Sequence, residues 1–405
     1  MKHNLLKYNI NRTEFLDSYN PMDLLKYMET NKIPMEEVSF AIGKFAMSTE
    51  RVFSRIEGKV TEEIFIRPSD EIISKQRDSQ EVCFIVASDD NDEYLRILEW
   101  IDNLFIPSNI DVTTLQITGV SSLASGYNEA MASSKAKYKI YIREGVRIIN
   151  PYFLFNILDI FENRKDVSMV GFLGSRYIPS NGIMESGVCY GKMAICGENK
   201  TFVFGENPKN DIEVSFIHSS IVATDSDMYW NENIPCNDEF TCSIHAMEYK
   251  KNGLKVLVPS QEFPWILYDY GHDSFLHDDS NKVLMEKFIF DPNKKHILMC
   301  IGASSLVEMK NGGLDKLEDN LKIFDENADK VQLFICLFPD DTRQWMNVAP
   351  DIFPKIERLL AGRNLIEKLT DNESFNYFDA YYGDSSPNVL KMSDAKKPVM
   401  IRSIT

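Results

Sequence analysis

The stretch Ser122–Pro151 constrains the fold more than any other, because a segment with helical periodicity runs directly into one with strand periodicity. Apolar residues recur at helical spacing in Leu123–Ser134, and Tyr138–Ile142 alternates as a strand. In an open α/β sheet, ligands bind outside the carboxyl ends of the strands. The residues after this strand are therefore expected to contact a bound group: Arg143, Glu144 and Gly145.

The segments around this junction continue the alternation of strands and helices. Glu81–Asp90 is predicted to be a buried strand that ends in small and acidic residues, and Val112–Ile117 a second strand. Asn91–Leu104 and Pro151–Asn163 show apolar faces at helical spacing. This order of elements predicts an α/β fold.

The same motifs resemble the bacterial family 2-like glycosyltransferases of the GT-A fold, in which an Asn-bearing helix precedes a strand that ends in an acidic metal-binding triplet. The resemblance spans residues 80–280 and implies a mixed sheet that binds a nucleotide-sugar donor. It implies donor contacts at the end of the first strand, on the helix and at the triplet position: Ala87, Ser88, Asp89, Asp90, Asn128, Arg143, Glu144 and Gly145.

The triplet position departs from the family, because Arg143, Glu144 and Gly145 replace the usual acidic ligands, and Tyr268 stands where a late histidine is common. Three interpretations remain open. The Arg143 guanidinium could pair with two phosphate oxygens and replace part of the metal's charge. Glu144 could hold Mg²⁺ or Mn²⁺ with help from the substrate phosphates, His272 lying four residues beyond Tyr268. Alternatively, Arg143 is a solvated residue in a site that has lost its chemistry.

A carboxylate before the last long helix acts as the general base in the resembled family. Glu239 and Asp238 are the candidates here, Glu239 fitting slightly better, since a carboxylate can accept the proton of an attacking hydroxyl. The same position suits a helix cap, with Asn237 or Asp238 beginning a helix over Glu239–Asn252 and Gly253 ending it. Both interpretations are kept.

Charge and cysteine content exclude several classes of protein. A net charge of −17 disfavours nucleic-acid binding, which depends on clustered Lys and Arg. Seven cysteines without a CxxC pair are expected to be reduced core residues, which favours a reducing compartment and disfavours a zinc site. No signal peptide or membrane span is predicted, so we expect a cytoplasmic protein, either free or peripheral at the inner face of the membrane.

Three domains are predicted: residues 1–75, 76–290 and 291–405. The first has helical patterns at Thr13–Glu29 and Met35–Ile56, expected to pack against the next domain or to form a dimer contact. Residues 67–80 are predicted to be a polar linker, and Gly174–Asp211 a set of hairpins that shapes an acceptor pocket.

Residues 291–405 alternate strand and helix, which predicts a small Rossmann-like parallel sheet. This segment resembles the nucleotide-binding half of GT-B glycosyltransferases and of CDP-glycerol glycerophosphotransferase-like proteins. The resemblance implies a phosphate-binding turn at Asp384, Ser385 and Ser386, although a plain turn and helix cap would also explain these residues. Asp340 and Asp341 stand where relatives carry a basic turn.

Taken together, these features predict a glycosyltransferase that moves a sugar from a nucleotide-sugar donor to a hydroxyl of a saccharide or protein, in bacterial surface polysaccharide or glycoprotein assembly. The alternative is a non-catalytic homologue that binds and stabilises an active partner glycosyltransferase. Either could form a homo-oligomer, since the segments outside 76–290 add surface without evident chemistry.

Overall fold

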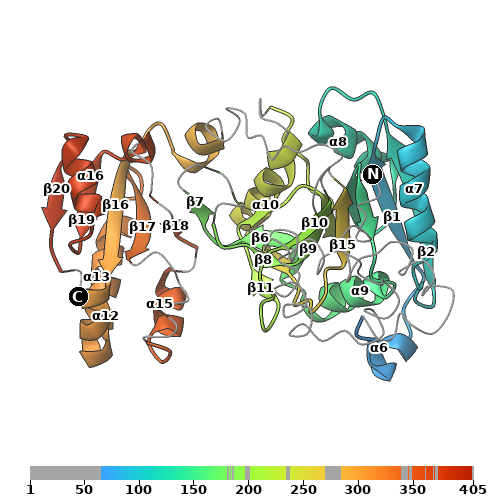
Figure 1. Ribbon diagram of the computed structural model, residues 1–405, viewed down its shortest axis with the longest axis horizontal. Helices are drawn as coiled ribbons and strands as arrows, with labels where there is room; N and C mark the ends of the chain where they lie inside the picture. The colour runs from blue at the N-terminus through green and yellow to red at the C-terminus, as the bar shows by residue number, and fades with distance from the viewer. Residues whose placement is uncertain are drawn as a thin grey trace, which may run out of the picture. The chain divides into compact units, whose positions relative to one another are not determined.

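The structure is a computed structural model that describes residues 65–179, 182, 184, 187–196, 201–233, 238–269, 284–338, 345, 349–360, 362–367, 369 and 373–403. The predicted helices Thr13–Glu29 and Met35–Ile56, and His272, lie outside these residues. The chain divides into two compact units (Figure 1). The larger comprises Met1–Gly174 and Cys189–Leu276, and the smaller Ser175–Val188 and His277–Thr405.

A seven-stranded mixed sheet forms the centre of the larger unit, in the order β11-β14-β5-β13-β3-β1-β2. β2, β1, β3, β5 and β14 run in one direction, and β13 and β11 run in the other. The strands are β1 Gln80–Ala87, β2 Ile110–Ile117, β3 Tyr138–Arg143, β5 Val167–Gly171, β11 Ile212–Glu213, β13 Ile221–Thr224 and β14 Lys255–Val258. The α/β fold with a mixed sheet, expected from the sequence, is confirmed.

Helices cover this sheet (Figure 1), and the first three of them follow the predicted apolar periodicity. They are α7 Asn91–Asp102, α8 Leu123–Ser133, α9 Phe153–Asn163 and α10 Thr241–Lys251. α8 packs on β1 and β2, while α9 and α10 pack on β5. β1 is buried on both faces, Cys83 and Ile85 on one and Phe84 and Val86 on the other, as its unbroken apolar run requires.

Two smaller sheets complete the larger unit. One has the order β10-β9-β15-β4, with strands β4 Val146–Ile148, β9 Met193–Cys196, β10 Thr201–Phe204 and β15 Ile266–Asp269. The other has the order β12-β6-β8, with strands β6 Leu173–Ser175, β8 Tyr190–Gly191 and β12 Phe216–Ile217. The turn after β3 carries the chain from the central sheet into β4, so it links two sheets at the predicted ligand edge.

An aromatic cluster fills the core between α8, α10 and the central sheet. Trp230 packs against Tyr127 and Tyr141, with ring centroids 4.8 Å apart in each case. His245 stacks on Trp230 at 3.6 Å between ring centroids, and its Nδ1 has no hydrogen-bond partner among the described residues. Burial lowers the pKa of His245 to about 3. His245 is therefore a packed residue of the core.

His245 should make the stability of the fold depend on pH. In the unfolded chain a histidine takes up a proton below about pH 6.5, whereas folded His245 stays neutral, so each pH unit below 6.5 should cost about 1.4 kcal/mol of unfolding free energy. His245→Phe keeps a flat apolar ring and should reduce the pH dependence by the share of His245, as measured by urea unfolding at about pH 7 and about pH 5. An unchanged slope in His245→Phe would contradict a neutral, buried His245.

The smaller unit contains the predicted parallel sheet, in the order β20-β19-β16-β17-β18-β7. Its strands are β7 Ile178–Pro179, β16 Lys295–Gly302, β17 Val331–Phe338, β18 Asn364–Glu367, β19 Ala380–Gly383 and β20 Val399–Ile401. Its helices include α12 Ala303–Glu308, α13 Leu314–Glu326, α15 Phe353–Leu360 and α16 Asn388–Asp394. Gly383 has φ 122°, and a Cβ there would lie 2.4 Å from the Cys300 carbonyl oxygen, so this strand end requires glycine.

One local prediction was wrong and another was only partly right. The predicted polar linker contains a short helix, α6 Asp70–Ser74, whose first turn is capped by the Ser69 side chain. In the predicted hairpin insertion, β9 pairs with β10 as an antiparallel hairpin. β7, however, joins β18, with Ile178 beside Ile366, 188 residues further along the chain. Residues distant in sequence determine that pairing, so the local pattern could not reveal it.

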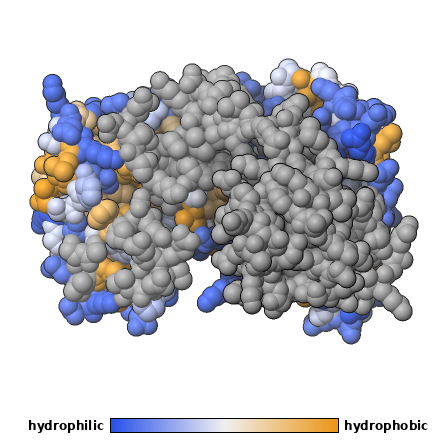
Figure 2. All heavy atoms as spheres, viewed as in Figure 1, coloured by the Kyte–Doolittle hydropathy of each residue, from blue (hydrophilic) through white to orange (hydrophobic). Residues whose placement is uncertain are grey.

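The state of the cysteines, the hydropathy of the helices and the apolar surface can be described for part of the chain. Five cysteines whose side chains are described, Cys83, Cys189, Cys242, Cys300 and Cys336, are free and buried. Within the described ranges, no helix is long and apolar enough to cross a membrane. Figure 2 shows apolar surface over α16 and β20, where Leu390, Met400 and Ile401 are exposed.

Candidate functional site

The carboxyl ends of β1, β2 and β3 lie level with one another. Ala87 pairs in register with Ile117 on one side and with Arg143 on the other. Beyond this point the Glu144 N–H donates to the Ala87 carbonyl at 2.9 Å, and the Ser88 N–H donates to Ile117 at 3.2 Å. The predicted strand-end residues are therefore brought together at one edge of the sheet.

The acidic residues after β1 are held by local hydrogen bonds. Asp89 Oδ1 accepts from the Gly119 N–H at 2.7 Å. Asp90 Oδ1 caps α7 by accepting from the N–H groups of Asp92 and Glu93. Ser88 Oγ donates to Glu144 Oε2 at 3.0 Å and also lies 2.9 Å from the Asp90 carbonyl oxygen. This edge is thus a hydrogen-bonded frame in which Ser88 positions the Glu144 carboxylate.

The turn between β3 and β4 is fixed by a buried ion pair. Gly145 has φ 83°, a left-handed conformation that glycine adopts without strain. Its N–H donates to Glu93 Oε1 at 3.1 Å, and the same oxygen pairs with Arg147 at 2.6 Å. Gly145, predicted to contact the donor, therefore has a structural role in shaping the turn that presents Arg143 and Glu144.

Three of the predicted charged residues influence the phenol of Tyr268. Burial raises the pKa of Tyr268, the positive charge of Arg143 opposes this shift, and the carboxylates of Glu239 and Glu144 add to it. β15 pairs Tyr268 with Val146, two residues after Glu144, which places it beside the turn.

The other side of the site is formed by α8 and the start of α10. Burial raises the pKa of Tyr127 well above its ordinary value, Arg143 lowers it and Asp238 raises it, so both charges lie near this phenol. Tyr127 is fully buried, and its hydroxyl makes no hydrogen bond to any residue in the described part of the chain. Sequence reasoning placed Tyr127 only on an apolar helix face and missed this polar atom.

Asp238 and Glu239 lie in a short 3₁₀ turn that precedes α10. Ser219 Oγ fixes this turn by donating to the Glu239 carbonyl at 2.6 Å and accepting from the Cys242 N–H at 3.1 Å. Asp238 Oδ1 accepts from the Leu123 N–H at 3.1 Å. Asp238 therefore caps the first turn of α8, and not its own helix as the capping interpretation had it, while Gly253 with φ 76° follows the end of α10 as predicted.

His218 is a second residue that sequence reasoning missed, since a lone histidine between apolar and serine residues carries no motif. Its ring packs edge-on against Tyr268 at 5.6 Å between centroids, and Nδ1 accepts from the Ser220 N–H at 3.2 Å. Burial, and after it the charge of Arg143, lower the pKa of His218 to about 3. The imidazole is therefore neutral at physiological pH and adds no charge to the site.

Asn128, predicted to contact the donor, has its side chain engaged within the protein. Its amide accepts from the Trp230 N–H and donates to the Trp230 carbonyl, both at 2.9 Å. Its Nδ2 also donates to Glu232 Oε1 at 2.6 Å. Both amide hydrogens are thereby used, and Asn128 fastens the loop after β13 to α8.

Removing the Asn128 amide should destabilise the larger unit. Asn128→Ala leaves the N–H and carbonyl of Trp230 buried without partners, so we expect a loss of at least about 2 kcal/mol in unfolding free energy, measured by urea unfolding. Glu129→Ala, on the exposed side of the same helix, is the matched control. If the two variants are equally stable and only Asn128→Ala weakens donor binding, Asn128 contacts the donor as predicted and has no structural role.

The model of the Glycosyltransferase like family matches residues 83–288, just over half of the chain. The chain belongs to this family. A search of curated proteins gives no match. Every element of the site described above, from the end of β1 to Tyr268, falls inside the matched residues.

Several solved structures share a weak likeness with this family member. The mannosyltransferase PcManGT from Pyrobaculum calidifontis, in complex with GDP-Man and Mn²⁺, is 9% identical over 60% of this chain and 70% of its own, with a TM-score of 0.33. S. aureus TarS 1–349 is 10% identical over 47% of this chain and 60% of its own, with a TM-score of 0.31. The glycosyltransferase GlyE of Streptococcus pneumoniae TIGR4 is 10% identical over 80% of this chain and 90% of its own, with a TM-score of 0.24. The family match, and not these low scores, identifies the chain.

The residues of the site do not supply a conventional set of metal ligands. Among the side chains that the structure describes, no three from His, Cys, Asp and Glu are grouped so as to hold a metal ion. Glu144 offers one carboxylate, and one of its oxygens already accepts from Ser88. A divalent cation prefers several hard oxygen ligands, so we derive no role for one from these residues.

The predicted phosphate turn of the smaller unit is tied into its own sheet. Asp384 Oδ2 accepts from the Gly302 N–H at 2.7 Å and from Ser305 Oγ, and Asp384 is 4% exposed. Ser386 Oγ accepts from the Asn388 N–H at 3.2 Å, while Ser385 is exposed. The Asp384 carboxylate thus joins the end of β19 to the end of β16. This geometry favours the turn interpretation of Asp384, Ser385 and Ser386 over phosphate binding.

Proposed function

We propose that this member of the glycosyltransferase family transfers a sugar from a nucleotide-sugar donor to a hydroxyl acceptor at the edge formed by β1 and β3. The observation that carries the proposal is that Arg143, Glu144 and Glu239 meet at one strand edge, because the neighbouring residues Ser219 and Ser220 bond to the Glu239 carbonyl and to the Arg143 N–H. One cation and two carboxylates at the ends of parallel strands match the needs of the reaction, because a diphosphate departs while a hydroxyl loses a proton.

Arg143 binds the diphosphate in this proposal. Its guanidinium presents several donors in a plane, which suits two phosphate oxygens, and it keeps its charge at all physiological pH values. The backbone of Arg143 is fixed, since its N–H donates to the Ser220 carbonyl at 2.9 Å. The fixed strand and the Gly145 turn together hold the side chain at the strand end.

Glu239 acts as the general base in this proposal. It accepts the proton of the acceptor hydroxyl as that oxygen bonds to the anomeric carbon, while the bond from this carbon to the phosphate oxygen breaks. The bonding electrons leave with the diphosphate, and the charge of Arg143 stabilises them. Asp238 is the weaker candidate because its Oδ1 already caps α8.

A second candidate function is a non-catalytic homologue that stabilises an active partner glycosyltransferase. It is supported by the exposed apolar side chains of Leu390 in α16 and of Met400 and Ile401 in β20, which is an edge strand among the strands that the structure describes. One titration separates the two functions. Calorimetry with nucleotide sugars should show binding that depends on Arg143 for the enzyme, and no binding for the non-catalytic homologue.

The biological role that we propose follows from the kind of acceptor. A family enzyme with a saccharide or protein acceptor would serve in bacterial surface polysaccharide or glycoprotein assembly, working in the cytoplasm or at the inner face of the membrane. Activity assays with purified donor sugars and candidate acceptors test this role. Turnover on small unrelated acceptors, with none on saccharides or proteins, would contradict it.

A further inference from the structure

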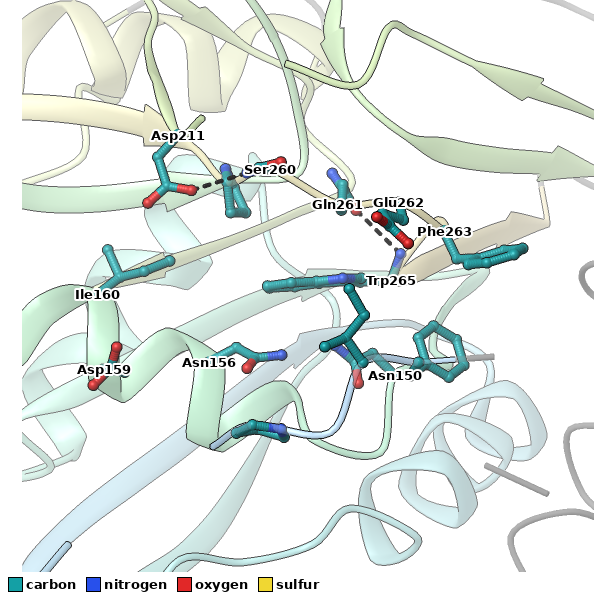
Figure 3. Close-up of a pocket in the computed structure, with 14 residues that line it drawn as sticks. Asn150, Asn156, Asp159, Ile160, Asp211, Ser260, Gln261, Glu262, Phe263 and Trp265 are labelled. Atoms are coloured by element: carbon teal, nitrogen blue, oxygen red, sulfur yellow. Dashed lines mark hydrogen bonds between the residues drawn. The ribbon is translucent and has the colours of Figure 1, made fainter. Parts of the chain in front are cut away.

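A pocket of about 280 Å³ lies in the larger unit, apart from the β1 and β3 edge (Figure 3). One wall is α9, which contributes Asn156 and Asp159, and the opposite wall is the segment before β15, which contributes Ser260. Pockets for small ligands have volumes of roughly 300–1,000 Å³, so this one is of the size for a small ligand or part of a chain.

Trp265 forms the centre of this pocket. Figure 3 shows its indole lying between the α9 side chains and Ser260. The backbone N–H of Trp265 donates to Gln261 Oε1 at 3.2 Å, which holds the main chain here, and the Trp265 ring packs against the Phe172 ring at 5.9 Å between centroids. Gln261 is itself held by a 2.8 Å bond to the Phe172 carbonyl. The platform is therefore preorganised.

The exposure of Trp265 sets it apart within the chain. The other three tryptophans, Trp100, Trp230 and Trp345, are at most 4% exposed, whereas Trp265 is only partly buried. An accessible indole at the bottom of a concave site offers a large apolar surface to a ligand at little entropic cost. No described contact of the proposed transfer site uses this ring.

The charged residues that line this pocket disfavour binding of the nucleotide-sugar donor. Three carboxylates line the pocket, Asp159, Asp211 and Glu262, and the residues that line it include no lysine or arginine. Asp211 Oδ1 accepts from the Ser260 N–H at 2.9 Å, which orients its carboxylate at the rim. Lys75 Nζ lies 3.8 Å from Asp159 Oδ1 and offsets part of this charge, and the remaining negative charge disfavours phosphate groups. A neutral ligand with an apolar face and many hydroxyl groups fits, since the hydroxyls can donate to carboxylates and the face can lie on the indole.

We propose that this pocket binds a neutral saccharide, as a subsite for the acceptor chain; this role as an acceptor subsite rests on the proposed function. A pyranose has C–H groups on one face and hydroxyls around its edge, which match Trp265 and the surrounding Asn156, Asp159 and Asp211. Trp265 immediately precedes β15 and Tyr268 lies within it, three residues or about 10 Å further along the strand. The pocket and the transfer site are therefore close along the chain.

Intrinsic fluorescence of the full chain tests the proposal without any donor. Neutral trisaccharides of glucose, mannose and N-acetylglucosamine are titrated at millimolar concentrations. Because Trp265 is the partly exposed tryptophan, binding of at least one trisaccharide should change the emission. Trp265→Phe should abolish the fluorescence response while calorimetry still detects heat, since a phenyl ring also stacks. Trp265→Ala and Asn156→Leu should each weaken binding at least about tenfold, equal to about 1.4 kcal/mol.

The outcomes separate this proposal from the transfer reaction. Arg143→Ala should leave trisaccharide binding unchanged, and Trp265→Ala should leave uridine diphosphate binding unchanged. Absence of binding for every trisaccharide would overturn the proposal, and so would binding that depends on Arg143 and not on Trp265 or Asn156. Choline is the remaining probe, because carboxylates around an indole also suit a cationic amine. If choline binds and no trisaccharide does, the ligand of this pocket is an amine and the saccharide proposal is wrong.

Discussion

Arg143→Ala should weaken the binding of a nucleotide-sugar donor by about ten- to a hundredfold and reduce sugar transfer at least as much. Hydrogen bonds to charged groups contribute about 1.5–3 kcal/mol, and each 1.4 kcal/mol is a factor of about ten in Kd. Calorimetry measures the affinity and a coupled assay of released nucleoside diphosphate measures the rate. Arg143→Lys should recover only part of the affinity, because an ammonium is a point charge without the planar pair of donors.

A surface arginine provides the matched control for this variant. Arg164 follows α9 and is 40% exposed in a 3.6 Å contact with Asp166, so Arg164→Ala removes the same charge far from the strand ends. Equal losses in both variants would show a general effect of net charge. Full donor affinity in Arg143→Ala would contradict the assignment and leave Arg143 as a solvated residue at a strand end.

Glu239→Gln should reduce the rate of transfer by about a hundred- to ten-thousandfold, the range for the loss of a general base. The amide has the shape of the carboxylate but cannot accept the proton, so donor affinity and melting temperature should stay nearly unchanged. Single-turnover assays with saturating donor measure the chemical step, and thermal unfolding checks the fold.

Asp238 supplies the comparison within the same turn. Asp238→Asn keeps an oxygen that can accept from the Leu123 N–H, and asparagine caps helices as well as aspartate does, so this variant should stay stable and active. Asp238→Ala should lose about 0.5–2 kcal/mol of stability. If Asp238→Asn abolishes transfer and Glu239→Gln does not, the base is Asp238. If neither substitution affects turnover, this turn has only a structural role.

Local patterns sufficed for the position of the candidate site. β1 is an apolar run followed by Ser88, and β3 ends at Arg143, which Glu144 follows. Because the two strands are parallel neighbours, these ends lie at one edge of the sheet. The amphipathic period predicted α8, and the Gly253 signal predicted the end of α10. In each case the information lies within a few residues of the element itself.

Long-range partners explain what the sequence could not show. Asn128 looked like a ligand contact, but its partner Trp230 lies 102 residues away. Asp238 looked like a cap for the next helix, yet it caps α8 from a distance of 115 residues. Trp265 forms a pocket only because α9 lies opposite it. No local period encodes such pairings, so only the folded chain reveals them.

In the proposed function, Arg143 binds the diphosphate of a nucleotide sugar in place of a metal ion. The most direct measurement is a calorimetric titration of the unaltered full chain with uridine and guanosine diphosphate sugars, once with a chelator and once with Mn²⁺. We predict binding of at least one donor with the same Kd in both conditions. Binding only with Mn²⁺, through Glu144 and ligands beyond those described, or no binding in either condition, would contradict the claim.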